Sequence, residues 1–192
     1  MVSEGFVTVV SGLPRSGTSV MMQMLAAGGI PLLVDSERRP DIDNPLGYFE
    51  LEEVKALARN HHFLDGAQGK AVKIIHALLQ HLPLDRSYRV IFMQRNLDEV
   101  LASQRKMLDR TGHAGAALTA IQLKAIFARQ LEQSRRWLEA HTDWIQTMEV
   151  EYSLLIADPE SAARDINAFL GSELDEAKMA AEVDPSLHRN RC

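Results

Sequence analysis

The sequence predicts an α/β protein: a three-layer sandwich around a mainly parallel sheet of about five strands. Strand-like apolar runs alternate with helical segments along the chain, which is typical of repeated strand–helix–strand units. The length of 192 residues fits one domain with a substantial core and is short for two. We therefore expect residues 1–192 to form a single domain.

The expected strands are short apolar runs, and the expected helices are the segments between them. In chain order the strands are Phe6–Ser11, Ile30–Val34, Ala71–Ile75, Arg89–Met93 and Trp144–Val150. The helices are expected at about Gly17–Ala27, Leu51–Asn60, Ala77–Leu82, Leu97–Thr111, Ala116–Ala140, Pro159–Leu170 and Leu174–Val183. Asp158 is a good N-cap for the sixth helix, and Gly171 is a good stop for it. The segment Asp35–Gly47 is expected to be a long surface loop that carries function.

Composition narrows the class of protein. The formal net charge of −5 argues against a general nucleic-acid binder, so we expect no nucleic-acid partner. The only cysteine is Cys192, which excludes an intrachain disulfide. The single cysteine and the lack of a recognisable targeting segment together predict a cytoplasmic protein. The apolar run Phe6–Val10 is far too short to span a membrane. The oligomeric state is left open.

The first expected strand runs into a loop with two glycines, Gly12 and Gly17, and then into a helix. This spacing resembles the phosphate-binding pattern G-x-x-x-x-G-K-S/T and predicts a P-loop NTPase-like fold, in which backbone N–H groups surround a phosphate. Ser19 keeps the hydroxyl of that pattern, but Thr18 stands where lysine is expected. Without that lysine the loop is suited to a less charged phosphate than a triphosphate. The alternative is that the glycines only permit a tight turn.

A second candidate phosphate site follows the expected strand Arg89–Met93. Arg95 stands at the tip of this strand, and Ser103 lies two turns into the next helix. In a doubly wound sheet ligands bind at the carboxyl ends of the strands, so both side chains are placed to hold a second phosphate. The strand end carries no aspartate of the kind that helps to hold Mg²⁺ in metal-dependent nucleotidases. Taken alone, Arg95 would be a surface ion-pair partner.

These residues resemble the sulfotransferases that use 3′-phosphoadenosine 5′-phosphosulfate (PAPS). The run Pro14-Arg15-Ser16-Gly17-Thr18-Ser19 is similar to the 5′-phosphosulfate loop of that family, and Arg95 with Ser103 is similar to its 3′-phosphate site. Weaker similarity covers Asn44–Glu50, Lys73, Val150–Tyr152, Asp158-Pro159 and Phe169–Gly171. The resemblance implies a small, bacterial-type enzyme that moves a sulfuryl group from PAPS to a hydroxyl or amine and releases adenosine 3′,5′-bisphosphate (PAP). It further implies a small-molecule or carbohydrate acceptor and no metal.

The sequence departs from the family pattern in three places. Arg15 stands where the cytosolic enzymes commonly have lysine, and Ser153-Leu154 replaces the usual acidic pair after the late tyrosine. The glycine-rich C-terminal cofactor segment of those enzymes has no counterpart in this sequence. Arg189 or Arg191 in the tail is a candidate substitute for that segment at the 3′-phosphate.

Glu50, Lys73 and His76 are the candidates on the acceptor side, and with Arg15 they form the expected catalytic set. The resemblance implies that Lys73 contacts the transferring group, although a strand-edge charge is an equally simple explanation of this lysine. It implies that Glu50 is the general base, whereas His76 lies close to where cytosolic members carry a basic histidine. We expect Glu50 rather than His76 to be the base. Arg15 and the loop N–H groups would stabilise charge on the departing phosphate.

Two other functions fit part of the same pattern. A metal-dependent P-loop kinase acting on a nucleotide or small molecule would share the fold, but it would need the lysine that is missing at position 18. A non-catalytic nucleotide-binding protein would keep Arg95 and Ser103 and lack a working base. Magnesium dependence separates the first from a sulfotransferase, and transfer of labelled sulfate separates the second.

Overall fold

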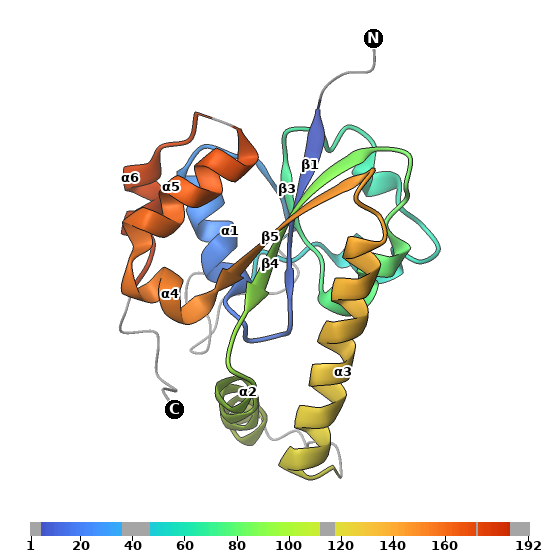
Figure 1. The fold of residues 1–192 in the computed structure, drawn as a ribbon, viewed down its shortest axis with the longest axis vertical. Helices are drawn as coiled ribbons and strands as arrows, with labels where there is room; N and C mark the ends of the chain where they lie inside the picture. The colour runs from blue at the N-terminus through green and yellow to red at the C-terminus, as the bar shows by residue number, and fades with distance from the viewer. Residues whose placement is uncertain (1–4, 36–46, 112–117, 172, 185–192) are drawn as a thin grey trace.

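The computed structural model describes residues 5–35, 47–111, 118–171 and 173–184. Its centre is a sheet of five parallel strands in the order β2-β3-β1-β4-β5 (Figure 1). The strands are β1 (Phe6–Gly12), β2 (Leu32–Leu33), β3 (Ala71–Lys73), β4 (Ser87–Gln94) and β5 (Ile145–Glu151). At the carboxyl end of the β1–β4 pair, Gly12 lies opposite Met93. The loops that follow these two strands therefore start at the same edge of the sheet.

Helices cover both faces of the sheet, as a three-layer sandwich requires. The α-helices are α1 (Thr18–Ala27), α2 (Leu97–Thr111), α3 (Ala120–Glu139), α4 (Tyr152–Ala157), α5 (Pro159–Leu170) and α6 (Glu176–Ala181). The 3₁₀-helices of the described ranges are η1 (Glu52–Ala56), η2 (His62–Leu64) and η3 (His76–His81). In Figure 1, α1, α5 and α6 lie together on one side of the sheet, and α3 lies on the other. None of the described helices is long and apolar enough to cross a membrane.

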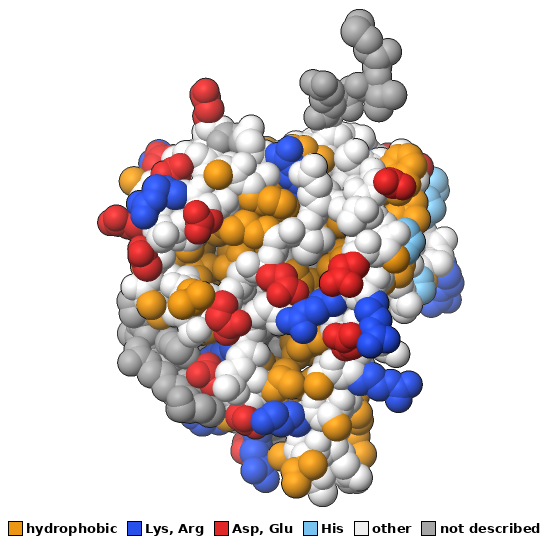
Figure 2. Space-filling model, in the orientation of Figure 1, with side chains coloured by type: hydrophobic (Ala, Val, Ile, Leu, Met, Phe, Trp, Pro, Cys, Tyr) orange, Lys and Arg blue, Asp and Glu red, His pale blue; other side chains and the backbone are white. Residues whose placement is uncertain are grey.

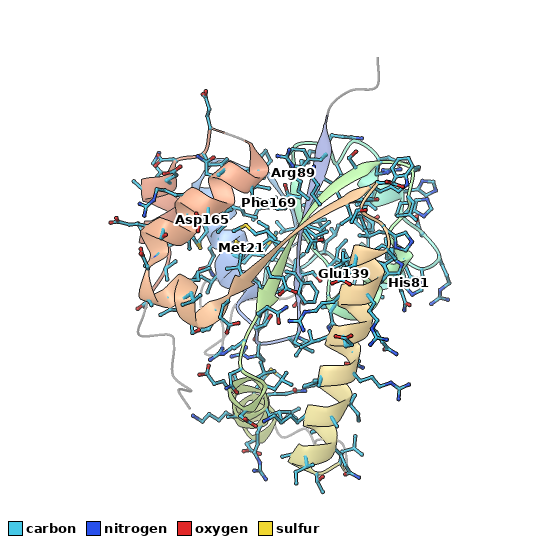
Figure 3. The ribbon with its side chains drawn as sticks, viewed as in Figure 1. Met21, His81, Arg89, Glu139, Asp165 and Phe169 are labelled. Carbon is cyan, nitrogen blue, oxygen red and sulfur yellow. The ribbon has the colours of Figure 1, made fainter. Side chains whose placement is uncertain are left out.

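Two apolar cores hold the layers together. Because side chains alternate along a strand, β1 sends Val9 to one core and Val10 to the other. The first core includes Leu138 of α3, and the second includes Met21 of α1 with Phe169 of α5 packed against it (Figure 3). In Figure 2 hydrophobic side chains gather where α5 meets the sheet, whereas acidic and basic side chains are mixed around α3.

The predicted fold class and the five strands are confirmed, and the sheet is parallel throughout. The second strand is shorter than expected, because Ile30–Val34 contributes only Leu32–Leu33. Pro31 lies inside the expected range and has no N–H group for the strand ladder, so the strand begins after it. The third strand ends at Lys73, two residues before the expected end.

Two expected α-helices are corrected to 3₁₀-helices. The range Leu51–Asn60 contains η1, and the range Ala77–Leu82 is largely η3. In both segments the buried side chains recur every three residues, at Val54 and Leu57 and again at His76, Leu79 and Leu82. A spacing of three matches the 3₁₀ repeat and keeps these side chains on one face.

The last third of the chain contains a helix that the sequence analysis does not predict. The helix α4 buries Tyr152, Leu155 and Ile156, an i, i+3, i+4 pattern confined to a short segment. The start and stop predicted for α5 are confirmed, because the carboxylate of Asp158 accepts a hydrogen bond from the Ser161 N–H group at 3.0 Å, and Gly171 ends the helix with a left-handed φ of 56°.

Candidate functional site

The loop between β1 and α1 needs glycine at two positions. Gly12 and Gly17 have φ angles of 146° and 100°, which other residues rarely adopt. A Cβ atom on Gly12 would lie 2.6 Å from Ser16 Oγ, and one on Gly17 would lie 2.5 Å from the Tyr152 ring. The Ser16 hydroxyl is buried and donates to the Leu13 carbonyl at 2.7 Å, which closes the turn. Conformation and close packing therefore both require the glycine spacing.

The start of α1 faces this loop without a side-chain cap. Gly17 is the N-cap residue, and no side chain of the described residues caps the helix there. Thr18 is buried in the first turn, Ser19 is half-buried, and Pro14 is exposed on the loop. The first N–H groups of a helix without a cap are suited to an anion, because the helix dipole places partial positive charge there.

Arg15 and Ser103 meet although 88 residues separate them. The Nε atom of Arg15 donates to Ser103 Oγ at 2.9 Å. The Arg15 carbonyl accepts from Nη1 of Arg95 at 3.1 Å. Arg95 Nε also donates to the Glu99 carboxylate at 2.9 Å, and these two side chains are 8% and 11% exposed. We call these four residues the arginine cluster: it joins the loop after β1 to the first turns of α2.

Tyr152 packs beneath the arginine cluster. The guanidinium carbon of Arg95 lies 4.4 Å from the centre of the tyrosine ring, a cation–π arrangement. The same ring fills the space beside Gly17. Burial raises the pKa of the Tyr152 phenol above its usual value of 10.0. The phenol therefore stays uncharged at neutral pH, and it does not cancel the positive charge of Arg95.

The end of β3 brings Lys73 to α1 and to the segment before η1. Lys73 Nζ donates to Ser19 Oγ at 3.0 Å and to the Tyr48 carbonyl at 2.6 Å. It lies 3.8 Å from a carboxylate oxygen of Glu50, and the side chains of Lys73 and Glu50 are 9% and 36% exposed. Between Tyr48 and Glu50, Phe49 has a left-handed φ of 53°. The structure thus brings together two of the three candidate acceptor-side residues, Lys73 and Glu50, and the carboxylate is partly exposed.

His76 makes a separate set of contacts, with the glycine loop and with α3. The side chain is buried, with Nδ1 at 3.3 Å from the Gly12 carbonyl and Nε2 at 3.2 Å from Oε1 of Gln130. Its backbone carbonyl accepts from the Ser134 hydroxyl at 3.2 Å. Both ring nitrogens are therefore engaged, and the imidazole links the glycine loop to α3.

Glu99, Tyr152 and Gln130 contact the predicted site residues, although the sequence analysis does not predict a role for them and names only Tyr152, within the weaker similarity at Val150–Tyr152. The sequence could have predicted the contact of Glu99, because Glu99 stands four residues after Arg95 at the start of a helix, a spacing that favours an ion pair. Tyr152 also had a local signal, since it follows a strand end as Arg95 does. Gln130 had no local signal, because the packing of α3 brings it to His76 across 54 residues.

Part of the predicted site lies outside the described residues. This applies to most of the expected loop Asp35–Gly47, including residues 36–46, and to the tail arginines Arg189 and Arg191. All four residues of the arginine cluster are among the described residues. Arg15 lies in the loop after β1, and the other three lie between the end of β4 and the first turns of α2.

Comparison with known proteins identifies the family. A family model described as the sulfotransferase domain matches residues 7–188 of this chain. The chain belongs to the sulfotransferase family. The match confirms the resemblance that the two phosphate-site patterns predict, and it does not favour the kinase alternative. No curated protein matches the chain.

Solved sulfotransferase structures share the fold at low sequence identity. The mouse sulfotransferase SULT7A1 complexed with PAP is 17% identical over 95% of this chain, with a TM-score of 0.51. The sulfotransferase STF1 from Mycobacterium tuberculosis is 18% identical over 93%, with a TM-score of 0.55. A sulfotransferase domain from the curacin biosynthetic pathway is 10% identical over 98%, with a TM-score of 0.53. This chain spans 63%, 71% and 92% of those three chains, respectively.

Proposed function

We propose that this chain transfers a sulfuryl group from PAPS to a hydroxyl or amine of a small-molecule or carbohydrate acceptor. The contact between Arg15 and Ser103 is the observation that carries the proposal, because it puts two candidate anion sites side by side. A donor with phosphate groups on the 5′ and 3′ carbons of one ribose requires two such neighbouring sites. We further propose that residues 1–192 act as one domain and that the protein works in the cytoplasm, in line with its single cysteine.

In this proposal the glycine loop binds the 5′-phosphosulfate. Backbone N–H groups from Arg15 to Thr18 surround it, within the run Pro14–Ser19, and the uncapped start of α1 adds its dipole. Arg95 and Ser103 bind the 3′-phosphate. Arg95 uses two of its five N–H groups on protein partners among the described residues, which leaves donors for a phosphate. The mouse relative was solved with PAP, which has both phosphates.

The proposed reaction is an in-line displacement at sulfur. The acceptor oxygen or nitrogen forms a bond to sulfur while the bond between sulfur and the bridging oxygen breaks, and the electron pair stays on the phosphate of PAP. Glu50 takes the acceptor proton, because its carboxylate is partly exposed whereas the ring nitrogens of His76 are engaged. Lys73, Arg15 and the loop N–H groups stabilise charge on the bridging oxygen. No metal takes part in this scheme.

Sulfuryl transfer is tested with PAPS that carries labelled sulfate and a panel of phenols, alcohols, amines and sugars. We expect label to move to at least one acceptor class, with one PAP released per sulfate transferred and no change when a chelator is added. Transfer of phosphate from Mg-ATP without sulfate transfer would support the kinase alternative. Tight binding of PAP with no transfer to any acceptor would support a non-catalytic nucleotide-binding protein.

A further inference from the structure

The pairing of β1 with β3 ends just before the glycine loop begins. The N–H group of Ile74 donates to the Val10 carbonyl at 3.0 Å, and β3 itself ends at Lys73. Because carbonyls alternate in direction along a strand, the Gly12 carbonyl is directed to the same side of β1 as the Val10 carbonyl. The strand β3 therefore ends before it reaches the last carbonyl of β1 on that side.

The side chain of His76 takes the place of a backbone donor at this carbonyl. Its Nδ1 atom lies 3.3 Å from the Gly12 carbonyl oxygen, and both residues are buried. A carbonyl can only accept a hydrogen bond, so Nδ1 carries the proton that His76 donates here. A buried carbonyl without a donor is unfavourable. The imidazole thus fixes the direction of the peptide group at the end of β1.

The helix α3 holds His76 in this orientation. Nε2 of the imidazole lies 3.2 Å from Oε1 of Gln130, and the Ser134 hydroxyl donates to the His76 carbonyl at 3.2 Å. Gln130 and Ser134 are four residues apart, so they lie on one face of α3. The amide of Gln130 has a donor end and an acceptor end, and it can pair with Nε2 whether or not that nitrogen is protonated. Both the ring and the backbone of His76 are therefore anchored on α3.

The carbonyl groups at the start of the glycine loop matter for an anion. Carbonyl oxygens carry partial negative charge and repel a phosphate, whereas N–H groups attract one. The Gly12 carbonyl is held by His76, and the next carbonyl, that of Leu13, accepts from the buried Ser16 hydroxyl at 2.7 Å. Both carbonyls are thus directed at protein donors rather than at the proposed 5′-phosphosulfate.

We propose that His76 is a positioning residue that holds the Gly12 carbonyl, so that the glycine loop keeps the shape that binds the 5′ end of the donor. This inference rests on the proposed use of PAPS. A positioning role at the loop affects donor affinity as well as the rate, because a displaced loop binds and aligns the donor less well. A base acts on the acceptor proton, and its loss leaves donor affinity unchanged. Donor affinity therefore separates the two roles.

The test compares three variants, His76→Ala, His76→Asn and His76→Gln, with the native chain. The amide nitrogen of asparagine takes the place of Nδ1 of histidine, so His76→Asn keeps a donor for Gly12. The amide nitrogen of glutamine takes the place of Nε2, so His76→Gln keeps the contact with Gln130 and loses the one with Gly12. Neither amide is basic. The two conservative variants thus divide the contacts of the imidazole, and neither could act as a base.

The measurements are calorimetric titration with 5′-AMP and PAP, and the rate of labelled sulfate transfer from PAPS. We expect His76→Ala and His76→Gln to lower the affinity for both nucleotides by about three- to tenfold, the range for one hydrogen bond, and to lower the rate by about tenfold. His76→Asn should stay within about threefold of the native chain in affinity and in rate. If His76→Ala does not fold, the comparison of His76→Asn with His76→Gln gives the same test.

Tyr88→Phe is the matched control, because it removes another hydrogen bond from a buried side chain to a carbonyl, that of Pro83 at 3.0 Å, near the amino-terminal end of β4. It should leave both affinities and the rate unchanged. Native nucleotide affinity in His76→Gln, or an equal loss of affinity in His76→Gln and His76→Asn, would overturn the inference. A native chain that transfers no sulfate would instead contradict the proposed function, while the nucleotide affinities would still test the role of His76.

Discussion

Two nearly buried cationic side chains, Arg95 and Lys73, lie at the carboxyl edge of the sheet, and each lies beside a carboxylate. Arg95 and Glu99 are buried to a similar degree and pair at 2.9 Å. Lys73 is as buried as Arg95, but its neighbour Glu50 is 36% exposed and lies 3.8 Å away. The first carboxylate pairs closely with an arginine, whereas the second is partly exposed. This difference in burial assigns a positioning role to Glu99 and makes Glu50 the candidate base.

Glu50→Gln keeps the size of the side chain and removes its basicity. We expect the variant to lower the rate of sulfuryl transfer by at least about 10²-fold, the lower end of a general base's contribution, while the PAP affinity stays within about threefold. His76→Ala should reduce the rate less and lower the melting temperature more, because its imidazole links Gly12 to Gln130. Transfer assays and thermal melts of both variants are the measurement. The opposite ranking of rates would move the base to His76.

Gly17→Ala tests the packing of the glycine loop on Tyr152. A methyl group at position 17 would combine an unfavourable φ of 100° with a 2.5 Å approach to the tyrosine ring. We expect loss of detectable PAP binding and a destabilisation of more than about 2 kcal/mol, beyond backbone strain alone. Gly29→Ala is the matched control, since Gly29 has a φ of 105° and nothing within 4 Å of a Cβ atom. It should cost about 1–2 kcal/mol and leave PAP binding intact. Equal effects of the two substitutions on PAP affinity would show that the contact with Tyr152 is unimportant.

At the scale of elements, parallel pairing assembles the site from distant segments. Lys73 at the end of β3 pairs with Val10 of β1, and Met93 of β4 pairs with Gly12. Three strands therefore end together, and the residues that follow them supply the glycine loop, the arginine cluster and the lysine contact. Because α1 and α2 begin directly beyond β1 and β4, their first turns face the same edge.

Elements with local signals are those that the sequence predicts best. The helices α2 and α5 match their expected ranges because caps, charges and apolar spacing agree along them. The segments at η1 and η3 form 3₁₀-helices where α-helices are expected. In such short segments the apolar residues do not distinguish the three-residue spacing of a 3₁₀-helix from the alternating spacing of three and four of an α-helix. Within the site, Arg15 and Ser103 are both identified from their patterns. Their contact depends on tertiary packing across 88 residues, which no local pattern encodes.

Asp158→Ala tests whether α5 depends on its cap. The Asp158 carboxylate accepts from the Ser161 N–H group, and removing it leaves the first turn of α5 uncapped. We expect a loss of about 1 kcal/mol of unfolding free energy, with unchanged PAP affinity because α5 lies away from the glycine loop. Asp143→Ala, at an exposed turn position before β5, serves as the control in a urea titration. A loss of PAP affinity in the capping variant would contradict the placement of α5 outside the donor site.

For the whole molecule, two buried tyrosines predict how stability depends on alkaline pH. Burial raises the pKa of Tyr88 and of Tyr152 above the usual value of 10.0. The unfolded chain then loses these protons at lower pH than the folded chain, so the unfolding free energy falls as the pH rises above about 10. We expect thermal melts between about pH 8 and pH 11 to show this decrease. A Tyr152→Phe variant should show a smaller decrease over the same range, and a slope equal to that of the native chain would contradict the pKa shift.

The central claim concerns the whole site: a loop for a 5′-phosphate and an arginine cluster for a 3′-phosphate form one donor pocket. Calorimetric titration of the native chain with PAP, 5′-AMP and ATP, with and without magnesium, tests it most directly. We predict that PAP binds at least about 100-fold more tightly than 5′-AMP, consistent with charge-assisted hydrogen bonds to a second phosphate, and that magnesium has no effect on PAP binding. Equal affinities for PAP and 5′-AMP, or a magnesium-dependent preference for ATP, would contradict the account.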